Sequence, residues 1–238
     1  MAIALRSALF YVTFTLWTLL WAIVLLPFPL LPQRWRYWGC GTWARVASNL
    51  FAWSIGVRYQ IQGLEHLPAG PCVLLSNHQS SLETLLIWHC VPRLAFVLKA
   101  ELLRLPIIGW YLPLSAPIAI DRKAGRQALK QVLEEGERRL RAGIPVLIFP
   151  EGTRQPCGEL GTFHQTGVAL AQRAGVPIVP VATNSGCFWP RNTWRKRSGE
   201  LHLHFGPMDP AADRSATVNQ RLRDWIAAEI KQMPMSSD

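Results

Sequence analysis

The amino-acid sequence predicts an α/β fold, a β-sheet covered by helices, preceded by a membrane-embedded helical hairpin. Two observations lead to this prediction. From about residue 58 onward, short apolar runs alternate with amphipathic segments, the pattern of strands alternating with helices. Before that point lies a long uncharged apolar run, followed by a more mixed segment. We therefore divide the 238 residues into an anchoring hairpin, residues 1–57, and an α/β domain, residues 58–238.

The first segment is long enough to cross a bilayer. No charged residue occurs between Ser7 and Gln33, and about 20 apolar residues suffice for a span. The run Ser7–Leu26 reaches this length before Pro27 ends the helix. A cleaved signal peptide is the alternative. Its apolar region would be about 7–15 residues long with a small-residue cleavage site, whereas this run is longer and ends in Leu-Leu-Pro.

The second segment, Tyr37–Val57, mixes large apolar residues with glycine and Arg45, which fits an interfacial helix packed back against the first. Positive charge flanks both ends of the first helix, so the charge rule gives no orientation. A full span and a hairpin buried in one leaflet fit equally well. Tryptophan is favoured at membrane–water interfaces, and six of the eleven lie in the first quarter of the chain: Trp17, Trp21, Trp35, Trp38, Trp43 and Trp53.

The remaining chain supplies strands and helices in turn. Five short apolar runs bounded by proline, glycine or polar residues predict buried strands: Val73–Ser76, Leu94–Leu98, Pro117–Ile120, Val146–Phe149 and Ile178–Ala182. Leu201–Phe205 alternates apolar residues with histidine, which predicts a half-exposed edge strand. Apolar periodicity predicts helices at Leu82–Cys90, Arg126–Ala142, Gln165–Ala174 and Thr217–Met233.

The charge balance, 25 Lys+Arg against 15 Asp+Glu, favours a polyanionic partner, either nucleic acid or anionic lipid. The tryptophans favour lipid, and no nucleic-acid-reading motif is present. The one dense basic run, residues 191–197, would suit anionic lipid or the phosphates of a donor equally. The five cysteines contain no C-x-x-C pair. We therefore expect buried reduced thiols, no metal site, and a reducing compartment around the catalytic part.

The first candidate for chemistry is His78, which follows the first buried strand, where α/β sheets place their sites. Histidine is the natural general base at neutral pH. Glu83 could hold one ring nitrogen and stabilise the imidazolium. The alternative is that Ser80 and Glu83 form a capping box, in which Glu83 satisfies a backbone N–H. The two interpretations are compatible.

Two further polar clusters follow buried strands. In the Glu151-Gly152-Thr153-Arg154 turn, the guanidinium offers a planar fork for phosphate, Gly152 permits a tight turn, and Glu151 could bind a hydroxyl. A structural turn with a surface ion pair is the alternative. Lys99 ends another strand and could meet a phosphate, or be an ordinary solvated lysine. The apolar run Leu105–Leu114 could line an acyl groove or belong to the core.

Together these clusters supply a base, a carboxylate and two cations, beside a membrane anchor. With these blocks the sequence resembles the 1-acylglycerol-3-phosphate acyltransferases, within the glycerolipid acyltransferases. Two departures are Glu83, where the family's commonest residue is aspartate, and His164, where many members carry lysine. Four blocks match in order: Asn77–Thr84 the family's His-x4-Asp block, Lys99–Gly109 its Lys-x-Glu-Leu…Pro-x-x-Gly block, Phe149–Arg154 its Phe-Pro-Glu-Gly-Thr-Arg block, and Val176–Val181 its Val-Pro-Ile-Val-Pro-Val block.

The resemblance implies a mixed sheet flanked by helices and an N-terminal pair of membrane-embedded helices. It also implies transfer of a fatty acyl group from acyl-CoA or acyl-carrier protein to the sn-2 hydroxyl of 1-acylglycerol-3-phosphate. The product would be phosphatidic acid, in phospholipid synthesis. No cofactor or metal is expected. The partners would be the lysolipid, the thioester donor and the bilayer, without nucleic acid, at the bacterial inner membrane with the active site facing the cytoplasm.

The same resemblance implies residue roles. His78 would be the base and Glu83 its orienter, Lys99 and Arg154 would bind the phosphate, and Glu151, Gly152 and Thr153 would contact the rest of the substrate. Another lysolipid or glycerol-3-phosphate as acceptor is an alternative with the same chemistry. A basic membrane-surface binding protein without catalysis is an alternative of a different class.

Overall fold

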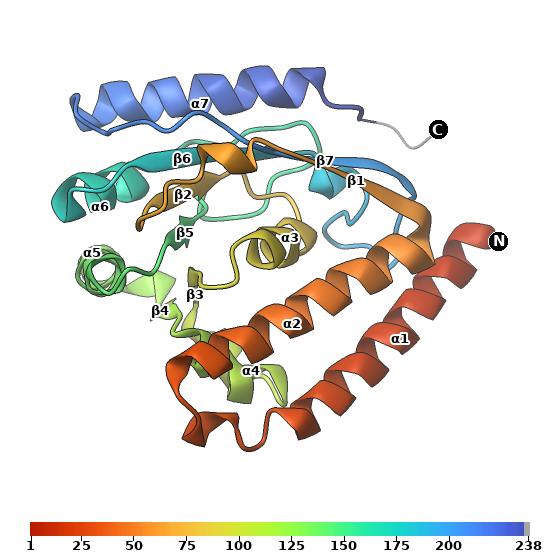
Figure 1. Ribbon diagram of the computed structural model, residues 1–238. Helices are drawn as coiled ribbons and strands as arrows, with labels where there is room; N and C mark the ends of the chain where they lie inside the picture. Colours follow the sequence, from red (N-terminus) through yellow and green to blue (C-terminus); the bar gives the residue numbers. More distant parts are fainter. Residues whose placement is uncertain (236–238) are drawn as a thin grey trace.

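The structure, a computed structural model, describes residues 1–235, apart from the side chain of residue 122. A seven-stranded sheet has the order β1-β7-β6-β2-β5-β3-β4 (Figure 1). Among the strand pairs in the described residues, only β6–β7 is antiparallel. The predicted mixed α/β sheet is therefore confirmed. The strands are β1 Val57–Gln62, β2 Val73–Ser76, β3 Ala95–Lys99, β4 Ile118–Ile120, β5 Val146–Ile148, β6 Ile178–Thr183 and β7 Gly199–Phe205.

Helices cover both faces of the sheet and bury two hydrophobic cores. The first core packs α1, α2 and α3 against one face, and the second packs α5, α6 and α7 against the other. Successive residues of β2 alternate between them: Leu74 lies in the first core, Val73 and Leu75 in the second. The helices are α1 Ala2–Val24, α2 Gln33–Phe51, α3 Leu82–Cys90, the short α4 Ile108–Tyr111, α5 Arg126–Arg141, α6 Thr166–Ala174 and α7 Ser215–Gln232.

Two sequence-based expectations for the sheet were wrong, and they have one cause. No strand was predicted at residues 57–62, Val-Arg-Tyr-Gln-Ile-Gln. These residues form β1 and pair with β7 along six residues. The missed pattern is a period-two alternation, the signal of a half-exposed strand. Because β1 lies beside β7, the predicted edge strand at 201–205 is an interior strand between β1 and β6. Its predicted half-exposure is correct.

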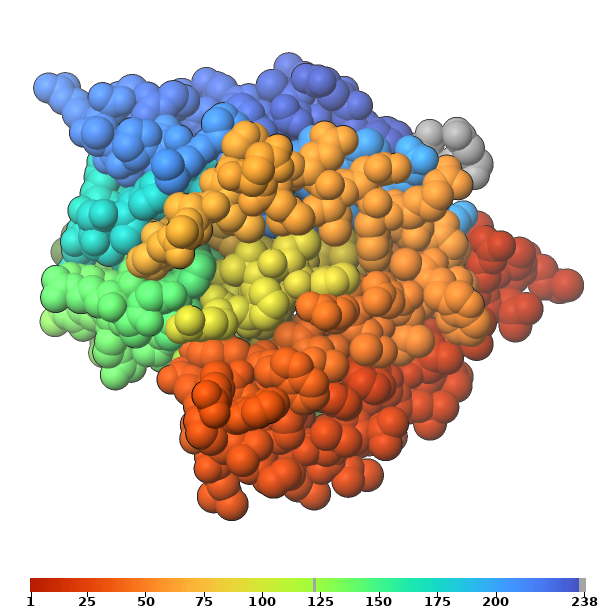
Figure 2. All heavy atoms as spheres, viewed as in Figure 1, coloured from red at the N-terminus to blue at the C-terminus, as the bar shows by residue number. Residues whose placement is uncertain are grey.

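The N-terminal segment forms the expected pair of packed helices. Helix α1 is the one helix, among those described, that is long and apolar enough to cross a membrane, and 11% of its most apolar window is buried. The indole N–H groups of Trp17 and Trp21 donate to the carbonyls of Trp43 and Gly39 on α2, at 3.2 and 2.8 Å. Figure 2 shows this part, red to orange, in continuous contact with the α/β domain.

Helix α1 also has a side that faces protein. Phe10 is fully buried, and its ring lies 5.2 Å from that of Trp189. The Ser7 hydroxyl accepts the backbone N–H of Lys196 at 2.8 Å. The Lys196 ammonium lies 5.6 and 5.1 Å from the ring centroids of Tyr11 and Trp189. Burial, and to a smaller extent the Arg154 charge, lower the pKa of Lys196 to about 8. The first hydrophobic core thus contains residues from both sides of residue 57. The division into two domains at that residue stays a prediction.

Candidate active site

One edge of the sheet holds the His78 turn and the Glu151–Arg154 turn, because the strands that precede these turns are neighbours. Strands β5 and β6 both pair in parallel with β2, with Leu75 opposite Ile148 and Pro180. The loops that follow these strands therefore reach the same carboxyl edge, where α/β folds place their sites. His78, the 149–154 turn and the loop after β6 all lie there. Lys99 ends β3, which pairs with β5, and its side chain is exposed.

His78 and Glu83 form a hydrogen-bonded pair. The imidazole Nδ1 lies 2.7 Å from Glu83 Oε1, the carboxylate is fully buried, and the imidazole is 13% exposed. A carboxylate only accepts, so we assign the ring hydrogen to Nδ1, which leaves Nε2 as the proton acceptor. The ring of Phe149 stacks on the imidazole, with centroids 4.0 Å apart. The hydrogen bond to Glu83 therefore restrains rotation of the imidazole within its plane, and the stacked Phe149 ring restrains its tilt.

The Glu83 carboxylate accepts four further groups. It accepts the backbone N–H groups of Gln79 and Ser80, at 2.9 Å each, together with the hydroxyls of Ser80 and Ser185. Burial raises the pKa of Glu83, but the donors His78, Ser185 and Ser80 outweigh it, so the pKa lies below its ordinary value. The longer side chain thus reaches His78 and also bonds the backbone N–H of Ser80, so the contacts of both interpretations are present. The catalytic role of the pair stays a prediction.

The Glu151–Arg154 turn folds over the His78 turn. Glu151 is buried, and its two carboxylate oxygens accept the backbone N–H groups of His78 at 2.7 Å and Gly161 at 2.9 Å. Burial raises the pKa of Glu151. Arg154 Nη2 donates to the Ser81 hydroxyl at 2.7 Å. Gly152 has φ +66°, which glycine adopts without strain. These contacts place Glu151 and Arg154 beside His78.

The structure leaves the substrate contacts of this site as predictions. They concern Lys99, Glu151, Gly152, Thr153 and Arg154, of which Lys99 and Thr153 are exposed. Within residues 1–235, no group of three or more histidine, cysteine, aspartate or glutamate side chains is placed to hold a metal ion. The expectation that no cofactor is needed stays a prediction.

Sequence reasoning missed several residues that build the site. The Asn77 amide donates to the Thr183 carbonyl and accepts the Thr183 N–H, both at 2.9 Å, which clamps the ends of β2 and β6 together. Ser81 orients Arg154, and Ser185 bonds Glu83. Asn77 and Ser81 lie inside the block Asn77–Thr84, so the resemblance could have marked them as site residues. Ser185 is 102 residues from Glu83, and no local pattern marks it.

The cysteine expectation was wrong for one pair. Cys157 and Cys187 form a disulfide, with Cα atoms 5.0 Å apart and a sequence separation of 30. They lie in the loops after β5 and β6, on either side of β2, so the topology and not the spacing brings them together. Cys40, Cys72 and Cys90 are free. Cysteine usage therefore gives no support for a reducing compartment.

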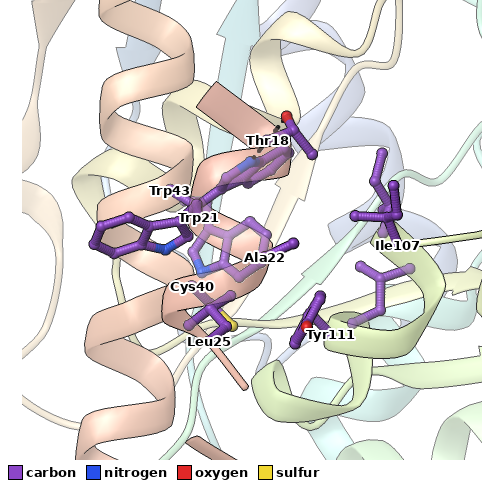
Figure 3. A pocket seen from close by; sticks show the side chains of 11 residues that line it. Thr18, Trp21, Ala22, Leu25, Cys40, Trp43, Ile107 and Tyr111 are labelled. Carbon is purple, nitrogen blue, oxygen red and sulfur yellow. Dashed lines mark hydrogen bonds between the residues drawn. The ribbon is translucent and has the colours of Figure 1, made fainter. Parts of the chain in front are cut away.

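An apolar pocket lies between α1, α2 and α4 (Figure 3). Its lining includes Trp21 and Ala22 of α1, Trp43 of α2, and Tyr111 of α4. Trp88 of α3 also lines it. Part of the apolar run 105–114 thus faces this pocket, whereas Trp110 is 67% exposed. Helix α3 carries Glu83 in its first turn and Trp88 five residues later, about 8 Å along the axis at 1.5 Å per residue.

Comparison with known proteins places this geometry in a family. Residues 58–184, more than half of the chain, match the family model described as acyltransferase. The chain is 40% identical over 236 residues to the 1-acyl-sn-glycerol-3-phosphate acyltransferase of Pseudomonas aeruginosa, covering 97% of this chain and 92% of that one. It is 36% identical over 137 residues to the beta form of human 1-acyl-sn-glycerol-3-phosphate acyltransferase, and spans about half of its length, 49%.

The fold has a counterpart among solved structures. The crystal structure of the 1-acyl-sn-glycerophosphate acyltransferase PlsC from Thermotoga maritima superposes with a TM-score of 0.82, at 22% identity, over 96% of this chain and 95% of that one. At that identity the superposition establishes the fold. The family model that matches residues 58–184 covers the His78 turn, the Glu151–Arg154 turn and strand β6. On the family model and the Pseudomonas relative together, the chain belongs to the acyltransferase family.

Proposed function

We propose that this protein transfers a fatty acyl group from a thioester donor, acyl-CoA or acyl-carrier protein, to the sn-2 hydroxyl of 1-acylglycerol-3-phosphate. The product is phosphatidic acid, which enters phospholipid synthesis. The observation that carries the proposal is the His78–Glu83 pair, 2.7 Å apart, bonded to the turn that presents Arg154. The acceptor chemistry follows the Pseudomonas relative, which is named for it.

The reaction runs through proton transfer at His78. Nε2 takes the proton of the acceptor hydroxyl as its oxygen attacks the thioester carbonyl carbon. The C–O bond forms, the C–S bond breaks, and the departing sulfur takes the proton back from the imidazolium. Glu83 stabilises the imidazolium between these two transfers and keeps Nε2 directed at the substrate. Holding both substrates at this edge of the sheet lowers the barrier further.

The acceptor phosphate binds to Arg154 and Lys99. The bond from Arg154 Nη2 to Ser81 fixes the guanidinium plane beside the His78 turn, and a planar guanidinium binds phosphate through parallel N–H donors. Lys99 approaches from the neighbouring strand β3. Glu151, Gly152 and Thr153, which directly precede Arg154 in the same turn, contact the glycerol oxygens.

Replacing Arg154 by alanine should raise KM for 1-acylglycerol-3-phosphate by about 10- to 100-fold, the worth of one or two charge-assisted hydrogen bonds. Transfer to an acceptor without phosphate, such as monoacylglycerol, should change little. Steady-state kinetics with both acceptors measures this difference. Arg58, an exposed arginine paired with Glu200, provides the control variant Arg58→Ala. Equal losses with both acceptors would contradict the phosphate role.

We further propose that the apolar pocket holds an acyl chain. Ala22 projects into it from α1. The change Ala22→Phe should shorten the preferred acyl chain of donor or acceptor by several carbons, because the ring occupies space that the chain would fill. Chain-length profiles of both substrates measure the effect. Unchanged profiles for both would place the acyl chains elsewhere.

The function as a whole is tested on the full chain purified in detergent. Turnover with 1-acylglycerol-3-phosphate, measured separately with acyl-CoA and acyl-carrier protein, identifies the donor, and a panel of lysolipids and glycerol-3-phosphate identifies the acceptor. Binding to anionic vesicles without turnover would favour the non-enzymatic alternative. We place the enzyme at the bacterial inner membrane, held by α1, with the active site facing the cytoplasm; protease accessibility in spheroplasts and inverted vesicles tests that orientation.

A further inference from the structure

The donors around the Glu83 carboxylate have two different origins. His78, Gln79 and Ser80 belong to the same turn as Glu83, so they move with the carboxylate if the turn shifts. Ser185 comes from the loop after β6, on the other side of the site. Its hydroxyl donates to Glu83 Oε2 at 2.6 Å, and both residues are fully buried. Among the donors to Glu83 in the described residues, it alone lies outside positions 78–83.

The loop that carries Ser185 is itself held firmly. The amide of Asn184 donates to the carbonyls of Glu200 at 3.2 Å and Pro234 at 2.7 Å, and its oxygen accepts the backbone N–H of His202 at 2.8 Å. The backbone N–H of Ser185 donates to the Thr183 hydroxyl at 3.2 Å. The Ser185 hydroxyl is therefore anchored to β6, β7 and the segment after α7 by contacts that involve neither Glu83 nor His78. The next residue, Gly186, also donates its backbone N–H to Gln79 Oε1 at 3.3 Å.

We propose that Ser185 is a positioning residue of the catalytic pair, whose hydroxyl holds the Glu83 carboxylate, and through it the His78 imidazole, in register with the rest of the site. Ser185 does not touch the reacting atoms. It fixes where the carboxylate lies relative to the sheet, and the carboxylate in turn fixes the direction of Nε2. The inference rests on the proposed function, because it assigns a role within that reaction.

Removing the hydroxyl has an electrostatic consequence as well as a geometric one. A buried carboxylate that loses a donor is stabilised less in its charged form, so it binds a proton more readily. The Glu83 carboxylate lies 2.7 Å from the imidazole, so the loss strengthens its attraction for a proton on the ring. The imidazole can act as a base only while Nε2 carries no proton. The acidic limb of the pH–rate profile should consequently move to higher pH.

The change Ser185→Ala should lower kcat about tenfold, the usual worth of a hydrogen bond to a charged group, and leave KM for both substrates nearly unchanged. The acidic limb of kcat/KM should shift upward by a measurable fraction of a pH unit. The control is Ser54→Ala, which removes another buried hydroxyl, one that donates to the backbone carbonyl of Leu50, four residues earlier. That variant should show wild-type kcat and pH profile.

A double-mutant cycle separates positioning from general support of the fold. If Ser185 acts through Glu83, then Ser185→Ala should cost far less when Glu83 is already glutamine. An equal loss in both backgrounds, a change confined to KM, or an unshifted acidic limb would overturn the proposal. Wild-type protein without turnover would instead refute the proposed function, so the two failures are distinguishable. Thermal unfolding of each variant confirms that folded protein is compared.

Discussion

The variant His78→Ala should lose about 10²- to 10⁴-fold in turnover, the range that a positioned general base contributes. The loss should appear in kcat, because the imidazole acts on the proton and does not hold the phosphate. Nε2 is the nitrogen that takes the proton, since Nδ1 is bonded to Glu83 at 2.7 Å. The measurement is the initial rate of thiol release with saturating donor and acceptor.

His66 provides the matched control. Its ring bonds the backbone carbonyl of Phe205 at 2.8 Å, on a short helical turn away from the His78 loop. His66→Ala should therefore retain activity within a few-fold. Vesicle binding and thermal unfolding of both variants should match the wild type. If His78→Ala retained most of its turnover, another group would have to be the base.

The variant Glu83→Gln should reduce turnover by a similar amount, about 10³-fold or more by comparison with orienting carboxylates of other histidine bases. Glutamine keeps the length of the side chain but removes the charge that stabilises the imidazolium. It also replaces one oxygen with an NH₂ group, which cannot accept the Ser80 and Ser185 hydroxyls that bond Glu83. Single-turnover kinetics distinguishes a slower chemical step from weaker binding.

The second variant at this position is Glu83→Asp, which keeps the charge. Aspartate is shorter by one methylene, and on this backbone its carboxylate should fall short of both His78 and Ser185. We expect activity between those of the glutamine variant and the wild type. If glutamine and aspartate were equally harmful, geometry rather than charge would be the dominant contribution of Glu83.

Local pattern predicted the parts of the fold that local chemistry determines. The buried strands and the main helices begin and end within a few residues of their predicted bounds, because their apolar runs are short, well bounded and periodic. Strand β1 was missed because residues 57–62 lie at the predicted boundary between the helical hairpin and the α/β domain. Without a predicted β1, nothing pairs with the outer side of β7, so β7 was predicted to be an edge strand.

The candidate site followed the same division. His78 with Glu83, and Glu151 with Arg154, were predicted because each pair lies within six residues along the chain. The contacts that hold these pairs in place join loops that follow different strands: His78 to Glu151, Ser81 to Arg154, and Glu83 to Ser185. The disulfide between Cys157 and Cys187 joins two such loops in the same way. Only the register of β2 with β5 and β6 brings such partners together, and sequence spacing carries no record of that register.

The inward side of α1 has a practical consequence for anyone who wants a water-soluble enzyme. Cutting away the first helix would leave a hole where Phe10 now lies against Phe51 and Trp189. It would also remove the hydrogen bond between the Ser7 hydroxyl and the backbone N–H of Lys196, which helps to hold the arginine-rich loop 191–197. That loop contacts the active-site turn, because Arg191 donates to the carbonyl of Arg154. Solubility is better sought by exchanging the outward leucines of the helix for polar residues than by truncation.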